Sequence, residues 1–121
     1  MKSRIKFANE NIKKAFENLE KNEPDLYKFV SRALEDIENN AFCGIQIPKR
    51  VIPIEYIKKF GAENIWKYNL PGAWRLIYSI ENTGISVISI VLEWMDHKTY
   101  ERRFKYQSLY LIKWKELLLL N

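Results

Sequence analysis

Four side chains in the second half of the chain carry groups that phosphodiester chemistry needs. Arg75 offers a guanidinium, which can hold two phosphate oxygens at once, and His97 is the only histidine. Because an imidazole changes protonation near neutral pH, His97 can act as a proton donor or acceptor. Tyr100 and Arg103 follow at intervals of three residues, which places them near His97 on one face of a helix. Their types and spacing predict a site that binds and cleaves a phosphodiester.

Each of these side chains also has a purely structural interpretation. Arg75 can form an ion pair with a strand carboxylate such as Glu93. His97 can be an ordinary surface residue at the start of a helix, and Tyr100 can pack on the edge of a sheet. Arg103 can be a solvated cation, or it can contact acidic residues of a partner protein. The sequence alone leaves both interpretations open.

The chain contains no pattern typical of a metal site. One histidine, one cysteine and scattered carboxylates give no ligand spacing. The chemistry predicted is therefore free of metal ions and of cofactors.

The excess positive charge lies in one part of the chain. The net charge is +5, and residues 1–44 are neutral, whereas residues 45–121 hold twelve basic and seven acidic side chains. Concentrated positive charge suits an anionic partner, with RNA or DNA the first candidates, although lysine-rich surfaces also serve solubility.

The single Cys43 cannot form an internal disulfide, and neither a signal peptide nor an apolar run of ~20 residues is seen. We therefore expect a cytoplasmic protein without a membrane partner.

The elements that must position these side chains follow from apolar spacing and turn residues. The spacing predicts amphipathic helices over residues 8–21 and 24–40, an irregular or extended segment over 45–53 and a short helix over 54–60. Strands are predicted at 65–70, 74–80 and 85–94, joined by Pro-Gly and Asn-Thr-Gly turns. Asp96 is expected to cap a short helix that runs to about residue 105. This order predicts an α+β domain, with an N-terminal helical hairpin on a small antiparallel sheet and a short C-terminal helix.

Two further expectations concern surfaces. Alternation puts Arg75, Ser79, Lys67 and Asn69 on one face of the sheet, which we expect to be the wetter face, with the helices on the other. Residues 1–106 are assigned to the domain. Residues 107–121 form an apolar tail, expected to be helical, that either packs on the sheet or needs a partner to cover it.

The segment KYNLPGAWRLIYSI, followed by VISIVLEWMDHKTYERRF, resembles the RelE/ParE toxin superfamily. In that family a strand ending in an Arg-aliphatic-aliphatic-Tyr pattern precedes another strand, a basic His/Arg segment and a terminal aromatic residue. The resemblance covers roughly residues 8–106. It implies the toxin of a type II toxin–antitoxin system, a metal-free endoribonuclease that cleaves mRNA on the ribosome and leaves 2′,3′-cyclic phosphate ends. It also implies two partners, a cognate antitoxin and the ribosome with its mRNA.

The resemblance assigns catalytic roles to Arg75, His97, Tyr100 and Lys67. Seven other basic residues are expected to contact RNA: Lys49, Arg50, Lys58, Lys59, Lys98, Arg102 and Arg103. One position departs from the family, because Asn69 stands where ribosome-dependent members place a second lysine. Two alternatives therefore remain, a ParE-type inhibitor of DNA gyrase without nuclease activity and a non-toxic relative that acts as a protein-binding module.

Overall fold

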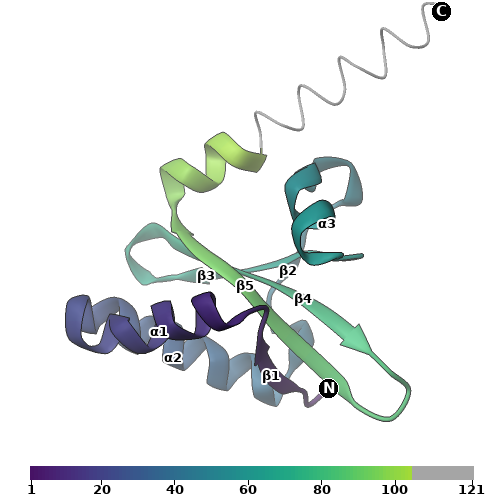
Figure 1. The fold of residues 1–121 in the computed structure, drawn as a ribbon, viewed down its shortest axis with the longest axis horizontal. Helices are drawn as coiled ribbons and strands as arrows, with labels where there is room; N and C mark the ends of the chain where they lie inside the picture. The colour runs from purple at the N-terminus through teal and green to yellow at the C-terminus, as the bar shows by residue number, and fades with distance from the viewer. Residues whose placement is uncertain (105–121) are drawn as a thin grey trace, which may run out of the picture.

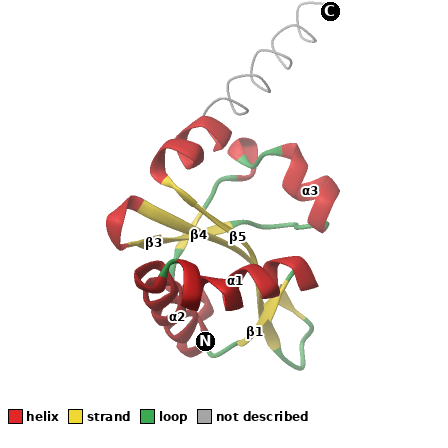
Figure 2. Cartoon of the chain, turned by 60° about the vertical axis from the view of Figure 1, so that its left-hand side comes forward, coloured by secondary structure: helices red, strands yellow, loops and turns green. Residues whose placement is uncertain are grey.

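The computed structural model describes residues 1–104, and the predicted tail at 107–121 lies outside the described residues. A mixed sheet of five strands forms the centre, with helices on both faces (Figures 1 and 2). The strands are β1 (Arg4–Phe7), β2 (Ile45–Gln46), β3 (Trp66–Leu70), β4 (Trp74–Asn82) and β5 (Val87–Asp96). The helices are α1 (Glu10–Asn22), α2 (Pro24–Asn39), α3 (Ile54–Phe60) and a C-terminal helix whose described part is 97–104. Short 3₁₀ turns occupy Ala41–Cys43, Lys49–Val51 and Pro71–Ala73.

The α+β class, the helical hairpin and the three central strands are confirmed, but the sheet has two strands more. Its order is β1-β5-β4-β3-β2. Strand β1 pairs in parallel with β5, so the sheet is mixed and not purely antiparallel. The segment predicted to be irregular or extended contains β2, which pairs with only two residues of β3 at the sheet edge. Pro48 follows shortly after β2 and keeps the strand short.

The expectation that one face of the sheet is wet was wrong. Helices α1 and α2 pack on the face that carries Leu76 and Tyr78. The face that carries Ile77 is also covered, by α3 and helix 97–104, and it forms a second core that includes Tyr56 and Phe104. Figure 2 shows the two helix layers on opposite sides of the strands. Strands β4 and β5 are thus central strands that bury apolar side chains on both faces.

Local sequence signals account for most of the element ends. The Asn9 side chain accepts a hydrogen bond from the amide of Ile12 at 3.0 Å and caps α1. Pro24 opens α2, where its fixed φ suits the first helical turn. Gly61 ends α3 in the left-handed conformation, with φ 62°, which glycine adopts without strain.

Candidate functional site

Arg75 and His97 meet where the sheet passes into the C-terminal helix. Arg75 lies at the start of β4 opposite Met95 of β5, and β5 ends at Asp96. The helix begins at residue 97 with no intervening loop. A guanidinium Nη2 of Arg75 lies 3.3 Å from Nδ1 of His97. Because a guanidinium can only donate, Nδ1 is the acceptor, and this contact favours the tautomer with its proton on Nε2.

Tyr100 lies one helical turn further on and presents its ring to two cations. The ammonium of Lys67 lies 4.8 Å from the ring centroid, and the guanidinium carbon of Arg75 lies 5.9 Å from it. Such contacts are attractive because the face of an aromatic ring is negative. The four side chains predicted to be catalytic are therefore brought together, from β3, β4 and helix 97–104.

The electrostatics of this cluster favour an anion. Partial burial lowers the pKa of Lys67 below that of an ordinary lysine, and the neighbouring positive charge of Arg75 lowers it further, while Glu101 opposes the shift. Glu101 also lies 3.8 Å from Nε2 of His97, one turn along the helix. Two cations that repel each other across a tyrosine ring would both be stabilised by a phosphate bound between them.

Arg75 still has an unused hydrogen-bond donor. One of its Nη atoms donates to the carbonyl oxygen of Trp74 at 3.1 Å, and the other faces His97. Its Nε is buried and has no hydrogen-bond partner. Unpaired buried donors are uncommon in native proteins, and a bound phosphate oxygen is one acceptor that could complete this one. The structural alternative, an ion pair from Arg75 to Glu93, does not occur, since Glu93 pairs with Arg103.

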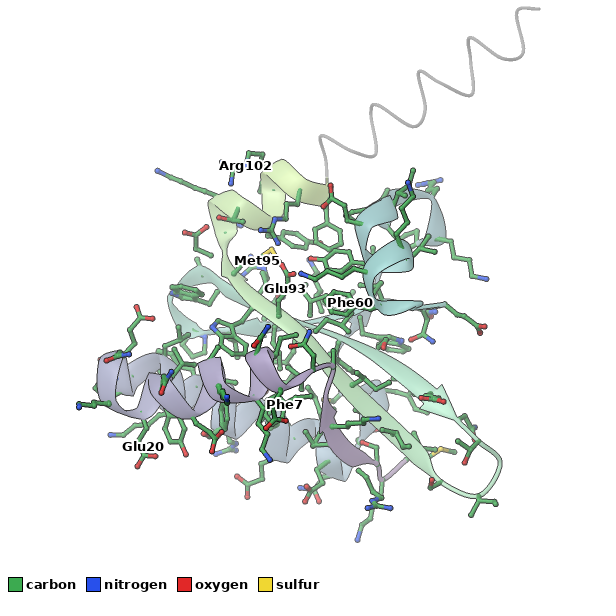
Figure 3. The ribbon with its side chains drawn as sticks, in the orientation of Figure 1. Phe7, Glu20, Phe60, Glu93, Met95 and Arg102 are labelled. Carbon is green, nitrogen blue, oxygen red and sulfur yellow. The ribbon has the colours of Figure 1, made fainter. Side chains whose placement is uncertain are left out.

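The seven basic residues predicted to contact RNA do not form one group. Lys49 and Arg50 lie in the exposed turn before α3, and Lys58 and Lys59 lie in its last turn. Lys98 and Arg102 are exposed on helix 97–104, and Figure 3 shows Arg102 on the outer surface of the molecule. The ring of Tyr56 in α3 stacks on that of Phe104 at 5.6 Å, so α3 and helix 97–104 are neighbours.

Arg103 differs from the other six. Its guanidinium forms an ion pair with Glu93 of β5, although the side chain remains partly exposed. Glu93 and Glu101 were not predicted as site residues. The spacing of His97 and Glu101 by four residues on a helix was a usable signal for that pair. No pattern in the sequence indicates the pairing of Glu93 with Arg103.

Within residues 1–104, no group of three or more His, Cys, Asp or Glu side chains is placed to hold a metal ion. No helix in that same range is long and apolar enough to cross a bilayer. Comparison with protein-family models, with curated proteins and with solved structures finds no match for this chain.

Proposed function

We propose that this chain is a RelE-like toxin that cleaves mRNA without a metal ion. The observation that carries the proposal is the cluster itself, in which Arg75, Lys67, Tyr100 and His97 lie within contact distance at one junction. These groups supply the functions that RNA cleavage by its own 2′-hydroxyl requires. They are a cation for the phosphate, a base for the hydroxyl proton and an acid for the leaving oxygen.

Each side chain has a role that its surroundings support. Arg75 holds the non-bridging oxygens of the scissile phosphate, and its unpaired Nε is a further donor. Lys67, with its lowered pKa, takes the 2′ proton as its neutral amine or balances charge as the ammonium. His97 protonates the 5′-oxygen as the P–O bond breaks, and the 2′-oxygen closes a 2′,3′-cyclic phosphate. Tyr100 keeps the two cations in place and offers its ring to a base.

The proposed partners follow from the same charges. Exposed cations on α3 and on helix 97–104 suit the phosphate backbone of mRNA or ribosomal RNA. An acidic segment of a cognate antitoxin would cover the same cations and would be steered to them by charge.

A direct test incubates the purified protein with mRNA, with and without programmed ribosomes, and analyses the ends of the products. The proposal expects 2′,3′-cyclic phosphate on the upstream fragment and a 5′-hydroxyl on the downstream fragment, because the 2′-oxygen is the nucleophile. Products with a 3′-hydroxyl and a 5′-phosphate would contradict the metal-free mechanism.

A second candidate function rests on Asn69. This residue is exposed and lies opposite Arg75 in the β3–β4 register, at the position where the family resemblance expects a second lysine. An asparagine supplies neither charge nor a base, which favours a ParE-type inhibitor of DNA gyrase. Loss of gyrase supercoiling with RNA left intact would select this alternative.

A further inference from the structure

Glu93, Arg103 and Tyr56 form a polar group beneath helix 97–104 to which the proposed reaction gives no part. We propose that the Glu93–Arg103 ion pair, seated on Tyr56, is a positioning device that fixes the rotation of helix 97–104 and thereby sets Tyr100 and His97 against Arg75. The contact geometry stands by itself, and the catalytic consequence rests on the proposed function.

A β-bulge in β5 brings Glu93 to this side of the sheet. Ile77 pairs with Glu93, but the next residue, Tyr78, pairs with Val91, so Leu92 is an extra residue in β5. Glu93 therefore lies on the same face as Ile77, the face that α3 and helix 97–104 cover. Figure 3 shows Glu93 and Met95 on that side of β5.

The ion pair joins two points that are ten residues apart, across the junction of strand and helix. Arg103 lies three residues after Tyr100, so the two side chains share one face of the helix. Because the ion pair keeps Arg103 next to Glu93, the same face of the helix directs Tyr100 toward β3 and β4. This rotation agrees with the position of the Tyr100 ring over Lys67 and Arg75.

Aromatic rings in contact with one another connect Tyr56 to Tyr100. Tyr56 is only 4% exposed, and its ring stacks on Phe104, which in turn contacts Tyr100 with ring centroids 4.6 Å apart. The Tyr56 hydroxyl lies beside the ion pair. Burial raises its pKa and the charge of Glu93 raises it further, so the phenol keeps its proton. A shift of Tyr56 or of the pair therefore moves Phe104 and then Tyr100.

The pair is better suited to positioning than to stabilising the fold. The side chains of Arg103 and Glu93 are 41% and 26% exposed, and ion pairs with that much solvent contact contribute little to stability. In contrast, a displacement of about 1 Å among catalytic groups can cost about 10²-fold in rate. Removing the pair should thus affect the reaction far more than the fold.

The test uses Glu93→Gln, Arg103→Gln and the double variant, with Glu35→Gln and Lys14→Gln on the distant α2 and α1 as charge-matched controls. Ribosome-dependent RNA cleavage is measured together with the NMR signals of the His97 imidazole and the Tyr100 ring. We expect each single variant to lose about 10²-fold in cleavage and to shift both sets of signals. The double variant should be no worse than either single one, because the two residues act as a unit.

The two readouts separate failure of this inference from failure of the proposed function. If the parent protein cuts no RNA, the proposed function is wrong, and the NMR signals alone decide whether the ion pair positions Tyr100 and His97. Signals that move in Glu93→Gln and Arg103→Gln, but not in the controls, support the positioning role. Unmoved signals overturn it, as does full activity in both variants. If Glu93→Gln does not fold, Arg103→Lys, which keeps the charge but not the planar fork, is judged by the same outcomes.

Discussion

Lys67 and Arg75 place two positive charges against one tyrosine ring. Partial burial lowers the pKa of Lys67, and the repulsion from the charge of Arg75 lowers it further. The carboxylate of Glu101 opposes this shift, but the net shift of the Lys67 pKa is still downward. An oxyanion bound between the two cations would offset the remainder, and it would do so best where negative charge is greatest, in the transition state.

Replacing Arg75 tests the phosphate-binding role of its guanidinium. We expect Arg75→Lys to lower kcat/KM for RNA cleavage by about 10²-fold, since lysine keeps the charge but loses bidentate binding. Arg75→Met should lower it further. Circular dichroism checks that both variants are folded, and activity equal to the parent in Arg75→Met would contradict the role.

The pH dependence of cleavage tests Lys67 as the base. A base must be neutral, and the pKa of Lys67 is lowered from the usual 10.5. Because Lys67 must be neutral while the proposed acid, His97, must carry its proton, the rate should rise with pH, pass through a maximum and then fall. In Lys67→Arg this rise should vanish, because a guanidinium stays charged, whereas the distant Lys14→Arg should keep it. Unchanged pH–rate profiles for Lys67→Arg would exclude Lys67 as the base.

At the scale of elements, the junction of β5 and helix 97–104 determines where the site forms. The strand runs to Asp96, and the helix starts at the next residue. The Asp96 carboxylate accepts a hydrogen bond from the amide of Thr99 at 2.8 Å and caps this helix. His97 is thereby held in the first turn, within reach of Arg75. Side chains held in place by regular elements in this way need little reordering when a ligand binds.

The cap predicts a defined pH dependence of stability. The hydrogen bond from the Thr99 amide lowers the pKa of Asp96 below its ordinary 3.8. Because the pKa of Asp96 is lower in the folded than in the unfolded protein, the ionised carboxylate stabilises the fold at pH values above its unfolded-state pKa. This stabilisation is lost as the pH falls through the folded-state pKa. Thermal melts from pH 7 to pH 2.5 should show this loss in the parent and not in Asp96→Asn, which keeps a capping oxygen. The same acid sensitivity in Asp96→Asn would contradict the assignment.

The sequence predicted the elements whose signals are local. Pro24, Gly61 and Asp96 marked helix ends correctly because capping depends on neighbours within a turn. Strand β1 was missed, since four residues of alternation are too short a signal and its partner β5 lies more than 80 residues away. The β-bulge at Leu92 leaves no signal in the sequence either, so the position of Glu93 could not be predicted.

The site was predictable only as a set of residue types. Arg75, His97 and Tyr100 were identified by their chemistry, by their spacing and by a family resemblance. The contacts among them depend on strand register and on the rotation of helix 97–104, which long-range pairing decides. For the same reason, the ion pair that Arg103 forms with Glu93 was not expected.

At the scale of the whole molecule, the two cores share the central strands. Tyr78 of β4 is fully buried and fixes the segment between α2 and β2. Its hydroxyl donates to the carbonyl oxygen of Ala41 at 2.8 Å and accepts from the amide of Gly44 at 3.1 Å. Because Gly44 lies against β3 at Lys67, this contact links the helical hairpin to the strand that carries Lys67.

Gly44→Ala should destabilise the protein by about 1–3 kcal/mol, as overpacking in a dense core does. The added methyl carbon would lie 2.6 Å from both the Lys67 carbonyl oxygen and the Tyr78 hydroxyl. Tyr78→Phe alone should cost about 1–3 kcal/mol, because it leaves the buried Ala41 carbonyl unpaired. In the double variant the two costs should be less than additive, since one clash is removed. Urea unfolding measures all three, and strict additivity would contradict the shared contact.

We propose that Arg75 and His97 cleave mRNA, and induction in a bacterial host tests this proposal most directly. RNA 5′ ends are mapped after induction of the parent, Arg75→Ala and His97→Ala, each confirmed to be folded and equally expressed. We predict growth arrest with new 5′ ends inside translated codons for the parent, and neither arrest nor new ends for the two variants. Cleavage and arrest at the parent level in both variants, or arrest of the parent without new ends, would contradict the account.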